Sequence, residues 1–433
     1  MRIIDGSKIP LVSFIYCLII ILYAGLATRF TRDLGSIDTV GNAVGMAITV
    51  FVYFQRKIVL DKKFLVVLIV FFTYGLLTTF NQGRFSFKWL TRWPMFFMIA
   101  YLLCHDLKDK LFVTIETVIC LLCVISLIFW TIQTISPSTI FSIVKQFQFD
   151  VPFSEEAKIE GNMLVFTLND IYNNKSFLGL FPRNAGFAWE PGAFGSYICL
   201  GLFSNMLRKG LSFTNNIPFF IMVITLLTTQ STTAIVAYGV SIAIWLAFSK
   251  NKLYALWVIP FLVWIYALPF ISEKAMMHYN DALGFSYSQI DFNHDLNRMQ
   301  SFIISWNEFL EHPILGLGGD VGGSIFRQRG FNIAIFSGIG ELLYRYGLIM
   351  SIVFFTVLYK SCIRINENYR SKAAFAFIGM FVCIMVGFNN WDQPIFVVFW
   401  LYCQFCYSPR YFLITKKCSS ERLNIWSKQH QIG

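Results

Sequence analysis

The sequence predicts an all-α, polytopic membrane protein that forms a single integral membrane domain over residues 1–433. Hydrophobic residues make up 56% of the chain and charged residues only 14%, a balance typical of membrane proteins rather than of large soluble folds. The apolar residues gather in runs long enough to cross about 30 Å of hydrocarbon. Two long polar segments, 136–191 and 271–340, interrupt these runs and are expected to be loops on the outer face.

About twelve apolar runs are candidate transmembrane helices. They lie near residues 10–27, 37–54, 64–80, 92–104, 111–135, 192–207, 217–230, 232–248, 253–270, 341–359, 373–388 and 394–408. Three of them are short, and the stretch 217–248 can also be taken as one long broken helix. The first run lacks a convincing cleavage site, so we interpret it as an uncleaved span.

The distribution of basic residues predicts the orientation. If the N-terminus is cytoplasmic, the short cytoplasmic connections carry the greater share of the 35 Lys and Arg residues. Both termini are then cytoplasmic, and the two long segments face outward. The net charge of +11 is mostly a signal of topology, with the lipid bilayer as the expected surrounding and no nucleic acid as partner.

The ten cysteines fall in predicted spans or on the predicted inner side, so no exported disulfide framework is implied. Two pairs have CxxC spacing, Cys120 with Cys123 and Cys403 with Cys406. In apolar helices such cysteines are expected to be small hydrophobic residues rather than metal ligands.

The end of the first outer segment carries an unusual set of polar residues. In FPRNAGFAWEPGAFG, Arg183 and Glu190 stand just ahead of an apolar run that is predicted to start a helix near Gly192. Pro191 suits the first turn of that helix, and Glu190 would then lie at its N-terminus, where the helix dipole favours a carboxylate. Charges at a membrane boundary are costly and often functional. The alternative is that they only mark where the helix meets water.

The second outer segment is predicted to contain an amphipathic helix from Leu296 to Leu310, because its apolar residues recur at helical spacing. Its polar face carries Arg298 and Glu308, and a glycine-rich turn follows. Arg327 and Arg329 come next, before the chain returns to the membrane at GIGELLYRYGLI. In that string Glu341 and Arg345 are four residues apart and are expected to pair.

Several common site types are missing from the sequence. There is no Walker A loop, no H-E-x-x-H motif and no D-x-D in an outer segment, so we expect no metal and no cofactor. Arginine forks match the paired oxygens of a phosphate or pyrophosphate. A lipid-linked pyrophosphate, with its tail in the bilayer and its head at the outer face, is therefore the expected substrate.

Four short motifs resemble the Wzy-type O-antigen and capsule polymerases, which share their layout with the O-antigen ligases. They are GFAWEPGAFGSY, LLTTQSTTAIVAY, Arg298 and Trp306 followed by HPILGLG, and SGIGELLYRYGLI. The resemblance implies an enzyme of lipopolysaccharide or capsule biosynthesis in the bacterial inner membrane. Such an enzyme transfers a growing glycan from undecaprenyl pyrophosphate onto a lipid-linked repeat unit, without metal or nucleotide donor. A protein that regulates chain length is a further candidate partner.

The resemblance also implies residue roles. Arg298 matches the loop arginine expected to bind the pyrophosphate, and Arg183, Arg327 and Arg329 are further candidates. Trp189 and Trp306 are candidates for stacking on sugars. Many ligases carry an arginine after the serine of the second motif, and ligases carry a His-Asn pair at the entry to the late span at 341–359. This chain has Thr232 and Phe336-Ser337 at these places.

We therefore expect a polymerase rather than a ligase, with Glu190 or Glu341 as the catalytic base, because a carboxylate at the membrane edge can have a raised pKa. A lipid-linked oligosaccharide flippase or transporter is the alternative of another class. It would show internal repeats, and charges in mid-membrane or broken helices in both halves, neither of which the sequence indicates. The polar stretch Thr228 to Thr233 is expected to be a tight outer turn, with a broken helix as the alternative.

Overall fold

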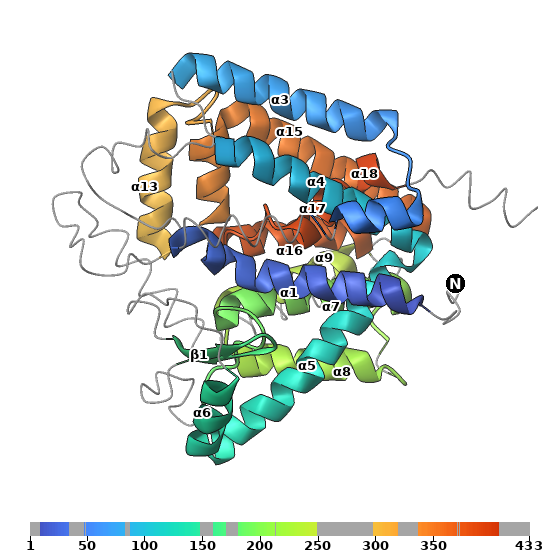
Figure 1. Ribbon diagram of the computed structural model, residues 1–433, viewed down its shortest axis with the longest axis vertical. Coiled ribbons are helices and arrows are strands. Elements are labelled where there is room, and N and C mark those ends of the chain that lie inside the picture. Colours follow the sequence, from blue (N-terminus) through green and yellow to red (C-terminus); the bar gives the residue numbers. More distant parts are fainter. Residues whose placement is uncertain are drawn as a thin grey trace, which may run out of the picture.

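The computed structural model describes residues 9–33, 47, 49–82, 87–147, 159–169, 181–212, 214–248, 298–318, 337–369, 371 and 373–406. Most of these residues are helical. The main helices are α1 (Leu11–Asp33), α3 (Lys62–Gln82), α4 (Phe87–Leu107), α5 (Leu111–Ile135), α7 (Pro191–Lys209), α8 (Ile217–Thr229), α9 (Thr232–Ala247), α15 (Gly338–Tyr369), α16 (Ala373–Gly387), α17 (Pro394–Trp400) and α18 (Tyr402–Phe405). Figure 1 shows many of them running side by side.

Wherever the structure describes a predicted span, that span is helical. The span predicted at 253–270 lies outside the described residues, and the one at 37–54 is described only in part. Three helical stretches are long and apolar enough to cross a membrane: Lys62–Asn81, Arg92–Ile135 and Gly338–Tyr369. The second contains both α4 and α5, which the 3-10 turn Lys108–Lys110 separates. The number of spans, twelve, stays a prediction.

Aromatic side chains hold the helices together. Phe203 of α7, Phe377 of α16 and Phe399 of α17 form one stack, with ring centroids 4.8 Å apart for Phe203 and Phe377 and 5.0 Å apart for Phe377 and Phe399. By contrast, the large apolar side chains of α3 that point outward, such as Leu65 and Ile69, are exposed. Because lipid tails solvate such side chains well, packing between helices relies on close contacts of this aromatic kind.

The first outer segment contains structure that the sequence does not predict. Helix α6 (Pro137–Gln146) follows α5 directly, and strands β1 (Ile159–Met163) and β2 (Phe166–Asn169) form an antiparallel hairpin. Their buried residues make a small separate core: Ile140, Val144, Met163, Phe166 and Leu168. The prediction of an all-α chain is therefore wrong here, because strands of five and four residues are too short to give a strand pattern.

The second outer segment contains the predicted amphipathic helix. Helix α13 (Arg298–Glu311) lies within one or two residues of the expected bounds. It buries Ile304 and Phe309 and leaves Trp306 and Leu310 exposed. In Figure 1 this helix stands across the end of the bundle rather than along it. We call this end, where α7, α9 and α15 begin at Pro191, Thr232 and Gly338, the site end.

Helix α15 is broken at Gly347, a break that the sequence analysis did not predict. Gly347 has φ 65° and ψ −173°, a conformation that only glycine adopts readily. The break frees backbone groups of α15, and the segment 313–318 pairs with them. Leu317 N donates to Tyr344 O at 3.0 Å, and Leu348 N donates to Pro313 O at 2.8 Å. We call this set of backbone bonds the Gly347 latch.

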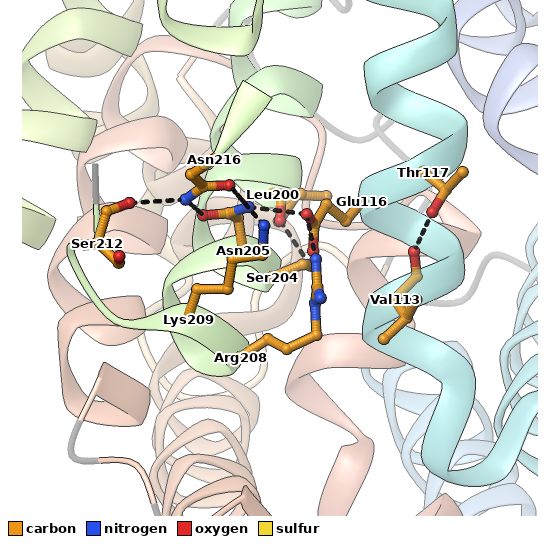
Figure 2. Close-up of polar contacts among 10 residues, drawn as sticks. All are labelled: Val113, Glu116, Thr117, Leu200, Ser204, Asn205, Arg208, Lys209, Ser212 and Asn216. Atoms are coloured by element: carbon orange, nitrogen blue, oxygen red, sulfur yellow. Dashed lines mark hydrogen bonds and ion pairs between the residues drawn. The ribbon is translucent and has the colours of Figure 1, made fainter. Parts of the chain in front are cut away.

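At the opposite end of α7, a buried ion pair ties three helices together (Figure 2). Arg208 binds Glu116 of α5 through two hydrogen bonds of 2.6 and 3.0 Å. Asn205 donates to the same carboxylate at 2.7 Å and exchanges two bonds of 2.9 Å with Asn216, the residue before α8. Glu116 is only 2% exposed. Because these polar groups bond to one another, we interpret them as a structural clamp that holds α5, α7 and the start of α8 together.

Candidate functional site

The segment 181–190 at the site end is anchored by a buried asparagine. Asn184 is fully buried, and its Oδ1 accepts hydrogen bonds from Ser126 Oγ of α5 at 2.7 Å and from Gly186 N at 3.0 Å. Its Nδ2 donates to Thr228 Oγ1 of α8 at 3.0 Å. A buried amide with partners on three segments fixes their relative positions. The sequence analysis missed Asn184, although a polar residue beside Arg183 in an otherwise apolar segment was a signal.

Arg183 points to the turn between α8 and α9. Its Nε donates to Thr229 O, the carbonyl of the last residue of α8, at 3.3 Å. A cation at this position is favoured, because the carbonyl end of a helix carries partial negative charge. Half-buried Arg183 is thereby held at the boundary of the bundle rather than extended into solvent.

The predicted tight turn from Thr228 to Thr233 is confirmed. Helix α8 ends at Thr229, Gln230 adopts a left-handed conformation, and Ser231 caps α9 by accepting a bond from Ala234 N at 3.4 Å. The threonine hydroxyls satisfy backbone carbonyls, since Thr229 Oγ1 donates to Leu226 O at 2.7 Å. The turn also contacts the Arg183 segment, because Gln230 Nε2 donates to Phe181 O at 3.2 Å.

Glu190 lies at the N-terminus of α7, as predicted. It is the N-cap residue, and Pro191 occupies the first turn of the helix. Its backbone carbonyl accepts the first helical bond from Phe194 N at 3.1 Å, while its side chain makes no capping bond. Trp189, the neighbouring candidate for sugar stacking, is half-buried, and its Nε1 has no hydrogen-bond partner in the described part of the chain.

Glu341 lies in the first turn of α15 and forms the predicted ion pair. Its Oε1 is 2.7 Å from Arg345 Nη1, and Glu341 as a whole is 4% exposed. Arg345 Nε also donates to Tyr344 Oη at 3.1 Å. Ser337 caps the helix, with its hydroxyl accepting from Gly340 N at 3.2 Å. The ion pair and the serine cap together fix the first turn of α15.

Helix α13 packs directly on this start of α15. A Cβ built on Gly340 would lie 2.8 Å from Ser305 Cβ, so the two helices touch at this point. Ser305 and Glu308 on the same helix are buried at 0% and 3% exposure. Trp306 faces outward at 42% exposure and stacks on Phe302. Arg298 is the first residue of α13, although its side chain lies outside the described residues, as do Arg327 and Arg329.

The starts of α7 and α15 meet at one residue. Gly192 and Gly338 both pack against Phe388, which follows α16. Gly195 of α7 in turn packs against Ala234 of α9. A chain of direct contacts at the site end therefore links the elements that carry Arg183, Glu190 and Glu341 with the 228–233 turn and helix α13.

The loop 388–393 adds polar residues that the sequence analysis missed. Asp392 pairs with Arg92 of α4 at 3.1 Å, and Asn390 Nδ2 donates to Ser196 Oγ of α7 at 3.3 Å. The signal was present in the sequence, because NNWDQP places a charge and three amides between two apolar runs.

This geometry defines a class of protein: mostly helical, of membrane type, with arginines, carboxylates and amides gathered at one end. Residues 217–339 match the model of the O-antigen ligase family. The match, over this part of the chain, supports the resemblance of the four motifs to the O-antigen ligase-like superfamily, which includes the Wzy-type polymerases. It runs from the start of α8 to the start of α15 and so includes the 228–233 turn and α13. No curated protein matches the chain.

Proposed function

We propose that this chain is an O-antigen polymerase. It transfers a growing glycan from undecaprenyl pyrophosphate onto the sugar of a lipid-linked repeat unit, without a metal or a nucleotide donor. The reaction takes place at the outer face of the bacterial inner membrane, with both termini in the cytoplasm. The single observation that carries the proposal is the convergence of all four motifs of the superfamily at the site end.

The arginines supply the electrostatic part of the proposed reaction. Arg183 at the 228–233 turn and Arg298 at the start of α13 bind the pyrophosphate, with Arg327 and Arg329 as further ligands. As the acceptor hydroxyl attacks the anomeric carbon, the bond to the pyrophosphate oxygen breaks and negative charge grows on the leaving group. Guanidinium groups already in place stabilise that charge without reorganisation.

Glu190 is the stronger of the two candidate bases. The carboxylate of Glu341 is engaged in an ion pair with Arg345, with Oε1 2.7 Å from Nη1. Glu190 is the N-cap residue of α7 and stands where the Arg183 segment meets that helix. We assign it the removal of the proton from the acceptor hydroxyl.

The residues at two positions of the motifs favour a polymerase over a ligase. Ligases of this superfamily, as the resemblance implies, carry an arginine after the serine of the second motif and a histidine before the last motif. Here Thr232 follows Ser231, the cap of α9, and Phe336 and Ser337, the cap of α15, stand at the position of the histidine. The arginine and the histidine of the ligases are therefore replaced at both positions. A ligase remains the second candidate, because the matching family model is that of O-antigen ligases.

A gel of surface glycan from a strain that lacks this gene tests the proposal. Loss of a polymerase leaves a single repeat unit on the lipid core, whereas loss of a ligase or a flippase leaves none. Complementation with the intact gene should restore the ladder of long chains. A deletion strain with bare lipid core contradicts the polymerase assignment. The side of the membrane on which lipid-linked material then accumulates separates ligase from flippase.

A further inference from the structure

A second group of buried polar side chains lies at the site end, centred on the Arg92–Asp392 ion pair. Arg92 Nη2 is 3.1 Å from Asp392 Oδ2, and Gln393 Nε2 donates to Asp392 Oδ1 at 3.1 Å. The bond from Asn390 to Ser196 holds the same loop against the second turn of α7. One residue further along α7, the ring of Tyr197 lies 5.5 Å, centroid to centroid, from that of Phe396 in α17, the helix that follows this loop directly.

Several polar atoms of this group lack hydrogen-bond partners within the described ranges. They are Arg92 Nε of the ion pair and, in the loop and α7, Tyr197 Oη, Asn389 Oδ1, Trp391 Nε1 and Gln393 Oε1. Tyr197 and Gln393 are each only 1% exposed. Nearly all buried polar atoms in proteins are paired, because an unpaired one costs free energy. Four unpaired atoms in one loop and the adjacent helix therefore indicate a place where a ligand supplies the partners.

The chemistry of the group indicates what kind of ligand fits. The hydroxyl of Tyr197 and the indole N–H of Trp391 donate, whereas the amide oxygens of Asn389 and Gln393 accept. The ion pair at the centre has no net charge. A sugar hydroxyl is neutral and both donates and accepts, whereas a pyrophosphate is anionic and mainly accepts. The set therefore matches a sugar.

Aromatic rings border the same group. The ring of Trp391 is 5.3 Å from that of Trp93 and 5.5 Å from that of Tyr346, centroid to centroid. Trp93 Nε1 donates to Tyr346 Oη at 3.0 Å, so these rings are fixed in place. Apolar ring surface beside hydrogen-bonding groups is the usual composition of a site that recognises small polar ligands.

We propose that the group around Arg92 and Asp392, with Tyr197, Trp391 and Gln393, binds the acceptor sugar of the lipid-linked repeat unit. This inference rests on the proposed function, since an acceptor sugar exists only if the chain transfers a glycan. In this proposal, donor and acceptor bind to different residues of the site end. The arginines Arg183 and Arg298 hold the pyrophosphate of the donor, and the neutral group positions the sugar whose hydroxyl attacks.

The test uses full-length protein in lipid vesicles, a labelled lipid-linked donor glycan and a lipid-linked single repeat as acceptor. Tyr197→Phe deletes only an oxygen that has no partner among the described residues. We expect the KM for the acceptor to rise about three- to tenfold, the worth of one hydrogen bond, with the KM for the donor and the thermal stability unchanged. Trp391→Phe, which removes the unpaired Nε1 and keeps a ring, should act in the same direction.

Tyr238→Phe is the matched control. Tyr238 on α9 is also buried, and its hydroxyl also lacks a partner in the described residues, but it does not belong to the group around Asp392. Its variant should keep the wild-type KM for both substrates. If Tyr197→Phe and Trp391→Phe behave like Tyr238→Phe, the acceptor assignment is wrong while the polymerase stands. A rise in the donor KM alone also overturns it. If the wild-type protein elongates nothing, the proposed function itself fails.

Discussion

At the scale of single residues, the proposed chemistry depends on guanidinium groups at the boundary of the helical bundle. Arg183 follows an exposed phenylalanine and a half-buried proline and precedes a fully buried asparagine. Its backbone is therefore fixed by Asn184, and its side chain is directed toward the carbonyl end of α8. This arrangement places a permanent positive charge where a phosphate head group would meet the protein.

Replacement of this charge should stop elongation. Arg183→Ala and Arg298→Ala should each lower the rate of elongation about a hundredfold, because each removes a group that stabilises the leaving pyrophosphate. Surface-glycan gels report the loss of elongation, and the amount of the variant in membranes shows whether the protein still inserts. Arg183→Lys keeps the charge but loses the planar fork and should recover only part of the rate. Normal chain lengths in both alanine variants would refute the pyrophosphate assignment.

The catalytic base can be identified by a similar substitution. Glu190→Gln keeps the size of the side chain and removes its ability to accept a proton, so the rate of the chemical step should fall about a hundredfold or more. The KM for the donor should stay near the wild-type value. Retained activity would shift the role to Glu341 or to a histidine, and Glu341→Gln then becomes the decisive variant.

At the scale of elements, the Gly347 latch joins α13 to α15. Because α15 breaks at Gly347, its carbonyls and amides pair with segment 313–318, directly after α13. Tyr74 of α3 adds a bond of 2.6 Å from its hydroxyl to Leu315 O. Irregular backbone at membrane depth is tolerated only where protein satisfies its polar groups, and the latch does this. The helix that carries Arg298 is thereby fixed relative to Glu341.

Gly347→Ala should disturb this junction. The backbone conformation is strained for alanine, which costs about 1–3 kcal/mol of the free energy of unfolding. The added Cβ would also lie 2.6 Å from Gly316 N. We expect lower thermal stability in detergent and shorter glycan chains. Gly210→Ala is the matched control, because Gly210 has a similar conformation, φ 67° and ψ −155°, at the opposite end of α7. Equal effects of both variants on chain length would show that the latch has no role in polymerisation.

The ion pair between Arg208 and Glu116, at the C-terminal end of α7, should matter for stability and not for the reaction. Arg208→Ala leaves the carboxylate of Glu116, which is 2% exposed, without its cation and should cost about 3 kcal/mol of the free energy of unfolding. Arg364→Ala breaks a pair of similar length with Glu367, whose side chain is 52% exposed, and should cost under about 1 kcal/mol. Thermal unfolding in detergent compares the two variants. Equal losses would mean that burial does not determine the strength of this clamp.

At the scale of the whole molecule, the site end combines a charged region with a membrane-type bundle, which suits a substrate with a diphosphate head and a polyprenol tail. The purified enzyme should elongate glycans only from donors that carry both parts. We expect donors without the diphosphate to react at least a hundredfold more slowly in lipid vesicles, because the arginines then have no leaving charge to stabilise. Equal rates with both donors would contradict the proposed mechanism.

Much of the helical architecture could be predicted because hydrophobicity acts locally. An apolar run of sufficient length must be helical in a bilayer, where no water satisfies the backbone, so α3, α5 and α15 follow from composition. Helix α13 could be predicted from its periodicity and Glu190 from the proline after it. The hairpin β1–β2 could not, because its two strands are too short to give a strand pattern. The break at Gly347 could not, because it depends on backbone partners in the separate segment 313–318.

The sequence by itself determined where most of the described helices run, that the chain is of membrane type, and that arginines and carboxylates gather in and around the two long polar segments. These properties follow from the free energy of transferring each segment between water and lipid, which depends on local composition. Only the tertiary structure decided that Asn184 anchors the Arg183 segment, that Phe388 joins the starts of α7 and α15, and that Asp392 pairs with Arg92. Such contacts depend on the packing of side chains from separate helices, which no local pattern specifies.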